Sequence, residues 1–157
     1  MRNFARFYYE NSSRLLIKRT KDDTIKDMID EAYLLKNVRE LRNACAHNNC
    51  ILNDLAAGTS KYKTNYGILR EISKIGIPNT TVSKRMSNSR IQQIITLLYL
   101  NKKITTSEGI VKYQTEILQD LKSRIEYHLD YYSKNTLIQS NFNFLNKIID
   151  NWYNTNI

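Results

Sequence analysis

Hydrophobic and polar positions along the chain alternate with the period of α-helices. From residue 25 onward, apolar side chains recur at steps of three and four, which is the spacing of one helix face. An earlier helix, or part of one, is expected within residues 2 to 19. Asp22 or Asp23 is expected to cap the next helix by accepting a backbone N–H bond. That helix should bury a stripe formed by Ile25, Met28, Ile29, Ala32, Leu35, Val38, Leu41 and Cys45.

The same period predicts further helices downstream. A short helix is expected within residues 49 to 57, ended by Gly58, and a loop over residues 58 to 67. The stretch ILREISKIG is typical of a short helix that ends at Gly76, with Pro78 just beyond. Ser87 is expected to cap a helix to about residue 101, and Ser107 to precede a long helix to about residue 133. A last helix is expected over about residues 141 to 153.

Each of these helices has an expected buried face. The face of the helix after Ser87 comprises Ile91, Ile94, Ile95, Leu98 and Tyr99. The long helix after Ser107 should bury Ile110, Ile117, Leu118, Leu121, Ile125 and Leu129. The last helix should bury Phe142, Leu145, Ile148, Ile149 and Trp152.

Composition supports the same fold class. The chain has 157 residues, enough for one domain with a sizeable core, and only 4 glycines and 1 proline. Because an all-β fold needs many tight turns, so few turn residues favour long helices. We expect an all-α fold, an irregular helical bundle formed by a single domain over residues 1–157.

The balance of charges narrows the class of partner. The formal net charge is +9, which suits a polyanion such as RNA, DNA or an anionic membrane surface, although a soluble protein with a basic surface is equally compatible with it. No apolar run is long enough to cross a bilayer, and the start MRNFARFYYENSS has no apolar core of the signal-peptide type. The two cysteines, Cys45 and Cys50, are then expected to be free thiols in the cytoplasm.

The stretch LRNACAHNNCILND, residues 41 to 54, concentrates candidate chemistry. It holds one of only two histidines in the chain, preceded by Arg42 and Asn43. Because each residue of a helix advances about 100°, Asn43 and His47 are neighbours four residues apart on one side of the helix. The long side chain of Arg42 can reach the same edge, which makes these three residues candidates for a catalytic site.

Such a group suits the cleavage of RNA by its own 2′-OH. A histidine imidazole can take up or release a proton near neutral pH, and an arginine stabilises the negative charge that develops on the phosphate. The substrate supplies its own nucleophile, so no metal or other cofactor is needed. Because the reaction requires both a base and an acid, we expect a homodimer with a composite site, in which a second copy supplies the second proton-transfer group.

LRNACAHNN resembles the RNxxxH sequence of HEPN-domain ribonucleases. The flanking residues, together with FARFYYEN near the start, are similar to the Abi-type (abortive infection) branch of bacterial anti-phage proteins. The resemblance covers about residues 4 to 55, and these proteins usually carry a further N-terminal region, so the chain is expected to correspond to their C-terminal portion. It implies an all-α dimeric endoribonuclease that cleaves RNA without a metal. Arg42 and His47 would be catalytic and Asn43 supportive, and a toxin-like effector would have a protein or an RNA as its antitoxin.

Other interpretations of the same residues remain open. His47 is also compatible with a structural histidine at a helix end, with Arg42 paired to Glu40 or Asp54. Cys45, His47 and Cys50 could contribute three ligands to a metal, whereas a structural zinc needs four. His128 lies on the predicted long helix without the spacing of the motif, which favours a structural role.

Basic residues elsewhere could guide an RNA strand. Lys61 and Lys63 flank Tyr62 in the loop after the motif, and Lys84, Arg85 and Arg90 form a second group. Lysines that neutralise phosphates beside a tyrosine that stacks on a base would form an RNA-binding edge. The alternative function is a non-catalytic RNA-binding or adaptor dimer of the same fold. It would bind RNA with a strong dependence on salt and leave it uncut.

Overall fold

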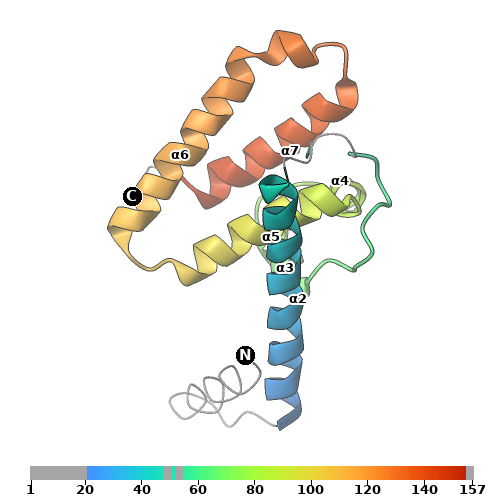
Figure 1. The fold of residues 1–157 in the computed structure, drawn as a ribbon, viewed down its shortest axis with the longest axis vertical. Coiled ribbons are helices and arrows are strands. Elements are labelled where there is room, and N and C mark those ends of the chain that lie inside the picture. Colours follow the sequence, from blue (N-terminus) through green and yellow to red (C-terminus); the bar gives the residue numbers. More distant parts are fainter. Residues whose placement is uncertain (1–20, 48–50, 52–54, 155–157) are drawn as a thin grey trace. The chain divides into compact units, whose positions relative to one another are not determined.

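The computed structural model describes residues 21–47, 51 and 55–154 (Figure 1). Every described element is a helix, which confirms the all-α prediction. The chain divides into two compact units, residues 1–36 and 37–157, and each is described by itself. The single domain expected over residues 1–157 stays a prediction, and the helix expected within residues 2 to 19 lies outside the described residues.

The described part of the first unit belongs to helix α2, Lys21–Ala46. Asp22 and Asp23 already lie inside α2, so the prediction that one of them caps it was wrong. Leu34 is buried, whereas Ile29 and Leu35 are 63% and 51% exposed. The predicted stripe was therefore misplaced here.

In the second unit, α2 buries Leu41 and Ala44 together with Asn37, and Cys45 is exposed. The buried row therefore contains a polar residue that a search for apolar spacing passes over. Because Asn37 was not counted, Cys45 was wrongly assigned to the buried stripe in place of Ala44.

Between α2 and the next helix, the described residues form turns and irregular structure. Within the stretch from 49 to 57, the structure describes residues 51 and 55–57, and none of them is helical. The prediction of a short helix was therefore wrong for these residues. Gly58 adopts a left-handed φ of 82° in a turn, a conformation that favours glycine. Helices α3 (Tyr66–Ser73), α4 (Asn79–Met86) and α5 (Ser89–Ile104) come next.

Helix α4 was not predicted from the sequence. It begins directly after Pro78, and its short sequence NTTVSKRM has only Val82 and Met86 as buried residues. The cap of α5 was predicted one residue too early. The side chain of Asn88, rather than Ser87, accepts a hydrogen bond from the backbone N–H of Ile91.

The core of the second unit surrounds α5, which contacts α3, α4 and the last helix, α7 (Thr136–Trp152). The predicted faces of α5 and α7 contribute Ile91, Ile95, Leu98, Ile148, Ile149 and Trp152 to the buried residues. Ile94, Tyr99, Phe142 and Leu145 are half-buried. Beyond the end of α7, the hydroxyl of Tyr153 donates a hydrogen bond to the carbonyl oxygen of Leu98, 2.7 Å away.

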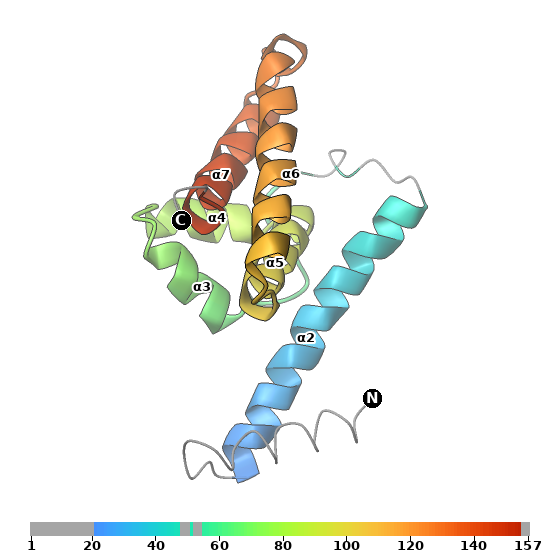
Figure 2. The same cartoon turned by 90° about the vertical axis from the view of Figure 1, so that its left-hand side faces the viewer.

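Helix α6 (Glu108–Tyr127) and α7 lie side by side and are joined through the short 3₁₀ helix η1 (Leu129–Tyr132), as Figures 1 and 2 show. The predicted buried stripe of α6 was wrong. Ile110, Ile117 and Leu121 are about half exposed, Leu129 in η1 is exposed, and Thr115 is the residue of α6 that is buried. Periodicity identifies an apolar face, but it does not say that a neighbouring element covers it.

A polar contact also joins α6 to α7. The ammonium group of Lys122 lies 2.8 Å from both carboxylate oxygens of Asp150. This hydrogen bond raises the pKa of Lys122 above its ordinary value. No helix in the described part of the chain is long and apolar enough to span a membrane.

Candidate functional site

The three residues of the RNxxxH sequence lie at the end of α2. Arg42 and Asn43 belong to its last turns, and His47 follows directly, with its backbone N–H donating to the carbonyl oxygen of Asn43 at 3.0 Å. All three side chains are exposed. The structure therefore leaves them accessible to a ligand.

The side chains of this group are arranged differently from the expectation. Arg42 Nη1 donates a hydrogen bond to Asn43 Oδ1 at 3.0 Å, so Asn43 is paired with the arginine. The described residues contain no hydrogen-bond partner for the imidazole of His47. Between the described residues Arg42 and Glu40 no ion pair is formed, and Glu40 instead accepts a hydrogen bond from Gln93. Asp54, the other partner of the structural alternative, lies outside the described residues.

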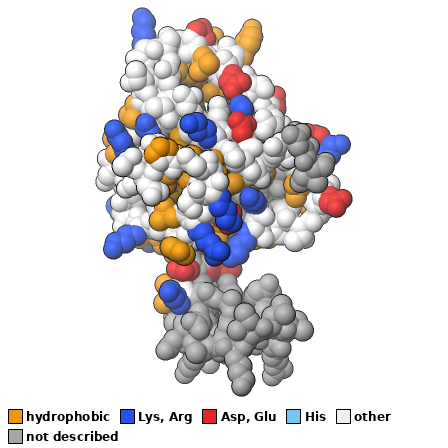
Figure 3. Space-filling model, turned by 180° about the vertical axis from the view of Figure 1, so that it is seen from behind, with side chains coloured by type: hydrophobic (Ala, Val, Ile, Leu, Met, Phe, Trp, Pro, Cys, Tyr) orange, Lys and Arg blue, Asp and Glu red, His pale blue; other side chains and the backbone are white. Residues whose placement is uncertain are grey.

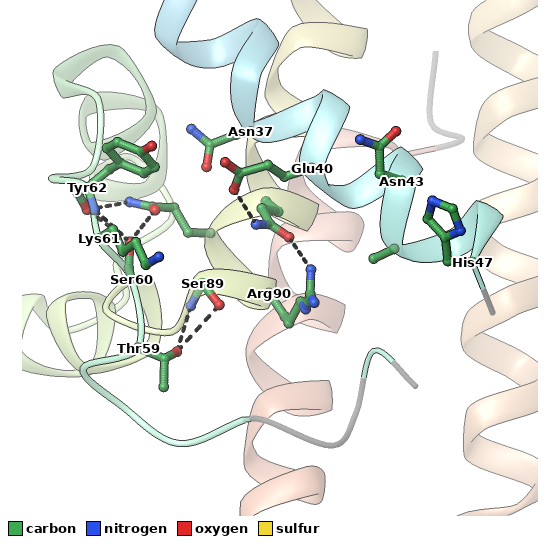
Figure 4. Close-up of a pocket in the computed structure, with 13 residues that line it drawn as sticks. Asn37, Glu40, Asn43, His47, Thr59, Ser60, Lys61, Tyr62, Ser89 and Arg90 are labelled. Atoms are coloured by element: carbon green, nitrogen blue, oxygen red, sulfur yellow. Dashed lines mark hydrogen bonds between the residues drawn. The ribbon is translucent and has the colours of Figure 1, made fainter. Parts of the chain in front are cut away.

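Asn43 and His47 line a cleft with a volume of about 430 Å³ (Figure 4). Three segments of the second unit form it: the last turns of α2, the loop over residues 59–62, and the first turn of α5. Its volume lies in the range of sites for small ligands, such as a nucleotide. Arg42 is not among the lining residues, and it is connected to the cleft through Asn43.

The loop over residues 59–62 is fixed to α5 by hydrogen bonds. The backbone N–H of Ser89 donates to Thr59 Oγ1 at 3.0 Å, and Gln92 Nε2 donates to the carbonyl oxygen of Tyr62 at 3.2 Å. Gln92 Oε1 also accepts a hydrogen bond from the hydroxyl of Ser60. Lys61 lies between two anchored residues of this loop, and its exposed side chain lines the cleft.

A chain of side chains links α2 with α5 across the floor of the cleft. Arg90 Nη1 donates to Gln93 Oε1 at 3.0 Å, and Gln93 Nε2 donates to Glu40 Oε2 at 3.0 Å (Figure 4). Gln93 is only 4% exposed, whereas Arg90 and Glu40 are half-buried. Among its described lining residues, the cleft thus contains two cations, Lys61 and Arg90, and one carboxylate, Glu40.

The structure brings some of the predicted RNA-binding residues to this cleft. Lys61 and Tyr62 line it, and Lys63 is exposed in the same loop. Lys84 and Arg85 are not lining residues. Both belong to α4, where Lys84 is exposed and Arg85 is half-buried, with its Nη1 donating to Asn141 Oδ1 at 3.3 Å.

Two other candidate sites were suggested by the sequence, a metal site that includes Cys50 and a structural site at His128. Among the described residues, no group of three or more His, Cys, Asp or Glu side chains could hold a metal, and Cys50 lies outside them. His128 lies between two aromatic rings, with its ring stacked on Tyr131 and edge-on to Tyr127 at centroid distances of 4.8 Å. This packing is compatible with the structural role expected for His128.

Sequence reasoning missed the contributions of Glu40 and Gln93. Glu40 lies two residues before Arg42, and Gln93 is one of a Gln-Gln pair inside an otherwise apolar helix segment. The sequence did contain one indication of this network, the two neighbouring glutamines at positions that the helix buries. Buried amides must find hydrogen-bond partners, so such residues point to a polar contact in the fold.

Comparison with known proteins gives no assignment for this site. No family model matches the chain, and neither a curated protein nor a solved structure matches it.

Proposed function

We propose that the protein is a metal-independent endoribonuclease with an HEPN-like fold, which acts in the cytoplasm as an abortive-infection or toxin effector in phage defence. The observation that carries this proposal is the position of Asn43 and His47 on a cleft that also contains Lys61 and Arg90. A phosphodiester needs cations and a group that moves a proton, and the cleft offers both. The resemblance of LRNACAHNN to the HEPN ribonuclease sequence supports the same reaction.

In the proposed reaction, the 2′-oxygen of the RNA attacks the adjacent phosphorus, and the bond from phosphorus to the 5′-oxygen breaks. His47 takes the proton from the 2′-hydroxyl, and a second group returns a proton to the departing 5′-oxygen. Arg42 stabilises the charge on the phosphate oxygens, and Asn43 positions the guanidinium through their hydrogen bond. The products are a cyclic 2′,3′-phosphate and a 5′-hydroxyl.

The second proton-transfer group is proposed to come from another copy of the chain, which forms a homodimer with a composite site. The cleft of one chain contains a single histidine, His47. Light scattering at micromolar concentration tests this part of the proposal. A monomer that cleaves RNA would contradict it.

The decisive experiment is cleavage of RNA in the presence of EDTA. Wild type is compared with His47→Ala and Arg42→Ala, and His128→Ala is the matched control that removes the other histidine. We expect the wild type and the control to produce cyclic-phosphate ends, and the two motif variants to be inactive while folded by circular dichroism. Equal cleavage by wild type and His47→Ala would reject the proposed active site.

A non-catalytic RNA-binding dimer is the second candidate function. One observation favours it: no described residue orients the imidazole of His47 by a hydrogen bond. This candidate predicts binding of RNA that weakens steeply with salt, without cleavage by any of the variants.

A further inference from the structure

Arg90 is the cation of the cleft whose side chain is held in place. It lies in the first turn of α5, is half-buried, and lines the same cleft as His47, which comes from α2. Lys61, by contrast, is exposed. An arginine presents up to five N–H donors in a planar fork that matches the oxygens of a phosphate.

The contacts of Arg90 orient the guanidinium without neutralising it. Its partner is the neutral amide of Gln93, and this amide, rather than the arginine, contacts the carboxylate of Glu40. No ion pair to Arg90 is formed within the described part of the chain. Within the described residues, one of the five donors is therefore used, and no carboxylate is bound directly to the guanidinium.

Two of the backbone N–H groups at the start of α5 are already used within the protein. The N–H of Ser89 already donates to Thr59 Oγ1, and the N–H of Ile91 donates to Asn88 Oδ1. These amides are not available to an anion. The guanidinium of Arg90 combines a positive charge with N–H donors beyond the one that Gln93 accepts.

We propose that Arg90 binds a phosphate of the RNA strand next to the one that is cleaved, with Gln93 and Glu40 holding its side chain in position. The identity of the ligand rests on the proposed function. Arg42 and His47 come from the end of α2, whereas Arg90 is brought to the cleft by α5. Because His47 and Arg90 line the same cleft, a strand bound along it with one phosphate at His47 is expected to present its neighbouring phosphate to Arg90. Because this contact is the same before and during the reaction, it contributes to KM rather than to kcat.

Binding is measured first, in a chain that carries His47→Ala so that the RNA stays intact. The probe is a short fluorescein-labelled single-stranded RNA, and its anisotropy is followed over a series of salt concentrations. Arg90→Gln is compared with Arg70→Gln, which removes the same charge from an exposed position on α3. We expect Arg90→Gln to weaken binding about tenfold or more, as for loss of a hydrogen bond to a charged group. The slope of log K against log salt should become shallower by about 0.7, the value for one phosphate of a single strand.

Equal affinities and equal salt slopes for the Arg90→Gln and Arg70→Gln chains would overturn the proposal. If Arg90→Gln does not fold by circular dichroism, Arg90→Lys is compared with Arg70→Lys instead. Lysine keeps the charge but loses the fork, so Arg90→Lys is expected to bind RNA more weakly than Arg70→Lys. Equal affinity of these two chains would overturn the proposal as well.

Kinetics separate this inference from the proposed ribonuclease activity. In a chain with an intact His47, Arg90→Gln should raise KM and leave kcat within about twofold, as expected for uniform binding. Cleavage with an unchanged KM in Arg90→Gln would reject the role of Arg90 and keep the activity. If Arg90→Gln binds RNA more weakly but wild type does not cleave RNA, the proposed phosphate contact stands and the proposed ribonuclease activity is rejected.

Discussion

Arg42 donates a hydrogen bond from Nη1 to the Oδ1 atom of its neighbour Asn43, 3.0 Å away. Both side chains are exposed at the end of α2, and Asn43 lines the cleft while Arg42 does not. The asparagine therefore connects the arginine to the cleft. The spacing of the RNxxxH sequence did not reveal this contact between its arginine and its asparagine.

Asn43→Ala is the first prediction, and it tests this connection. We expect the cleavage rate to fall about tenfold, which corresponds to loss of about one hydrogen bond worth 1.4 kcal/mol in the transition state. Stability should stay within about 0.5 kcal/mol of wild type, because the side chain is exposed. Single-turnover cleavage and urea denaturation measure the two effects. An unchanged cleavage rate in a folded Asn43→Ala would show that Arg42 needs no such support.

Gln92→Leu is expected to loosen the loop that carries Lys61. Gln92 is buried, and its side chain bonds to Ser60, to the carbonyl oxygen of Tyr62 and to Thr64. Removing it takes away these hydrogen bonds between the loop and α5, and should cost about 1–3 kcal/mol of unfolding free energy. Chemical denaturation measures the loss, and Gln139→Leu is the control, a half-buried glutamine on α7. Equal stability of the two variants would contradict the importance of this network.

Two isoleucine-to-alanine variants test whether the apolar face of α6 is exposed, by comparing their losses of unfolding free energy. Ile148→Ala removes a fully buried side chain of α7 and should cost about 2–5 kcal/mol. Ile117→Ala changes a side chain of α6 that is 49% exposed, so it should cost much less, about 1 kcal/mol or below. Urea denaturation of both chains gives the difference. A loss at Ile117 as large as that at Ile148 would mean that the α6 face is covered in the folded protein.

The same two residues show what the sequence could predict and what it could not. Ile117 and Ile148 both lie on apolar faces with helical spacing, and the spacing predicted both helices. It could not tell which face has a neighbour, because that depends on how helices pack together. Helix α4 was missed for a related reason, since its sequence has only two buried side chains and begins directly after a proline.

The candidate site also has a part that the sequence could predict and a part that it could not. Local spacing placed Asn43 and His47 at the end of one helix, because residues four apart are neighbours on a helix surface. Glu40, Gln93 and Arg90 meet only because α2 and α5 approach each other in the second unit. Contacts between residues about 50 positions apart depend on the tertiary fold, so spacing in the sequence did not reveal them.

Lysine and arginine side chains are spread over the face of the molecule in Figure 3, among hydrophobic ones. The net charge of +9 therefore did not identify a binding edge by itself. Lys61 and Arg90 line the cleft beside the motif, whereas Lys84 and Arg85 do not line it.

The buried hydroxyl of Tyr153 is expected to make the free energy of unfolding depend on pH in the alkaline range. Its hydroxyl donates to the carbonyl oxygen of Leu98 at 2.7 Å, and burial raises the pKa of this tyrosine above its ordinary value of about 10. The folded state therefore holds the phenolic proton more tightly than the unfolded state does. This contribution is complete below pH about 10, and it is lost as the pH rises through the higher pKa of the folded state.

Tyr153→Phe should remove this contribution. At neutral pH we expect a loss of about 1 kcal/mol, because the carbonyl of Leu98 loses its donor. Above pH 10 the stability of wild type should fall more steeply than that of Tyr153→Phe, so the two curves converge. Urea denaturation between neutral pH and about pH 11 measures both curves, with Tyr66→Phe, an exposed tyrosine, as the control. Parallel curves for wild type and Tyr153→Phe would show that the buried hydroxyl does not cause the alkaline loss of stability.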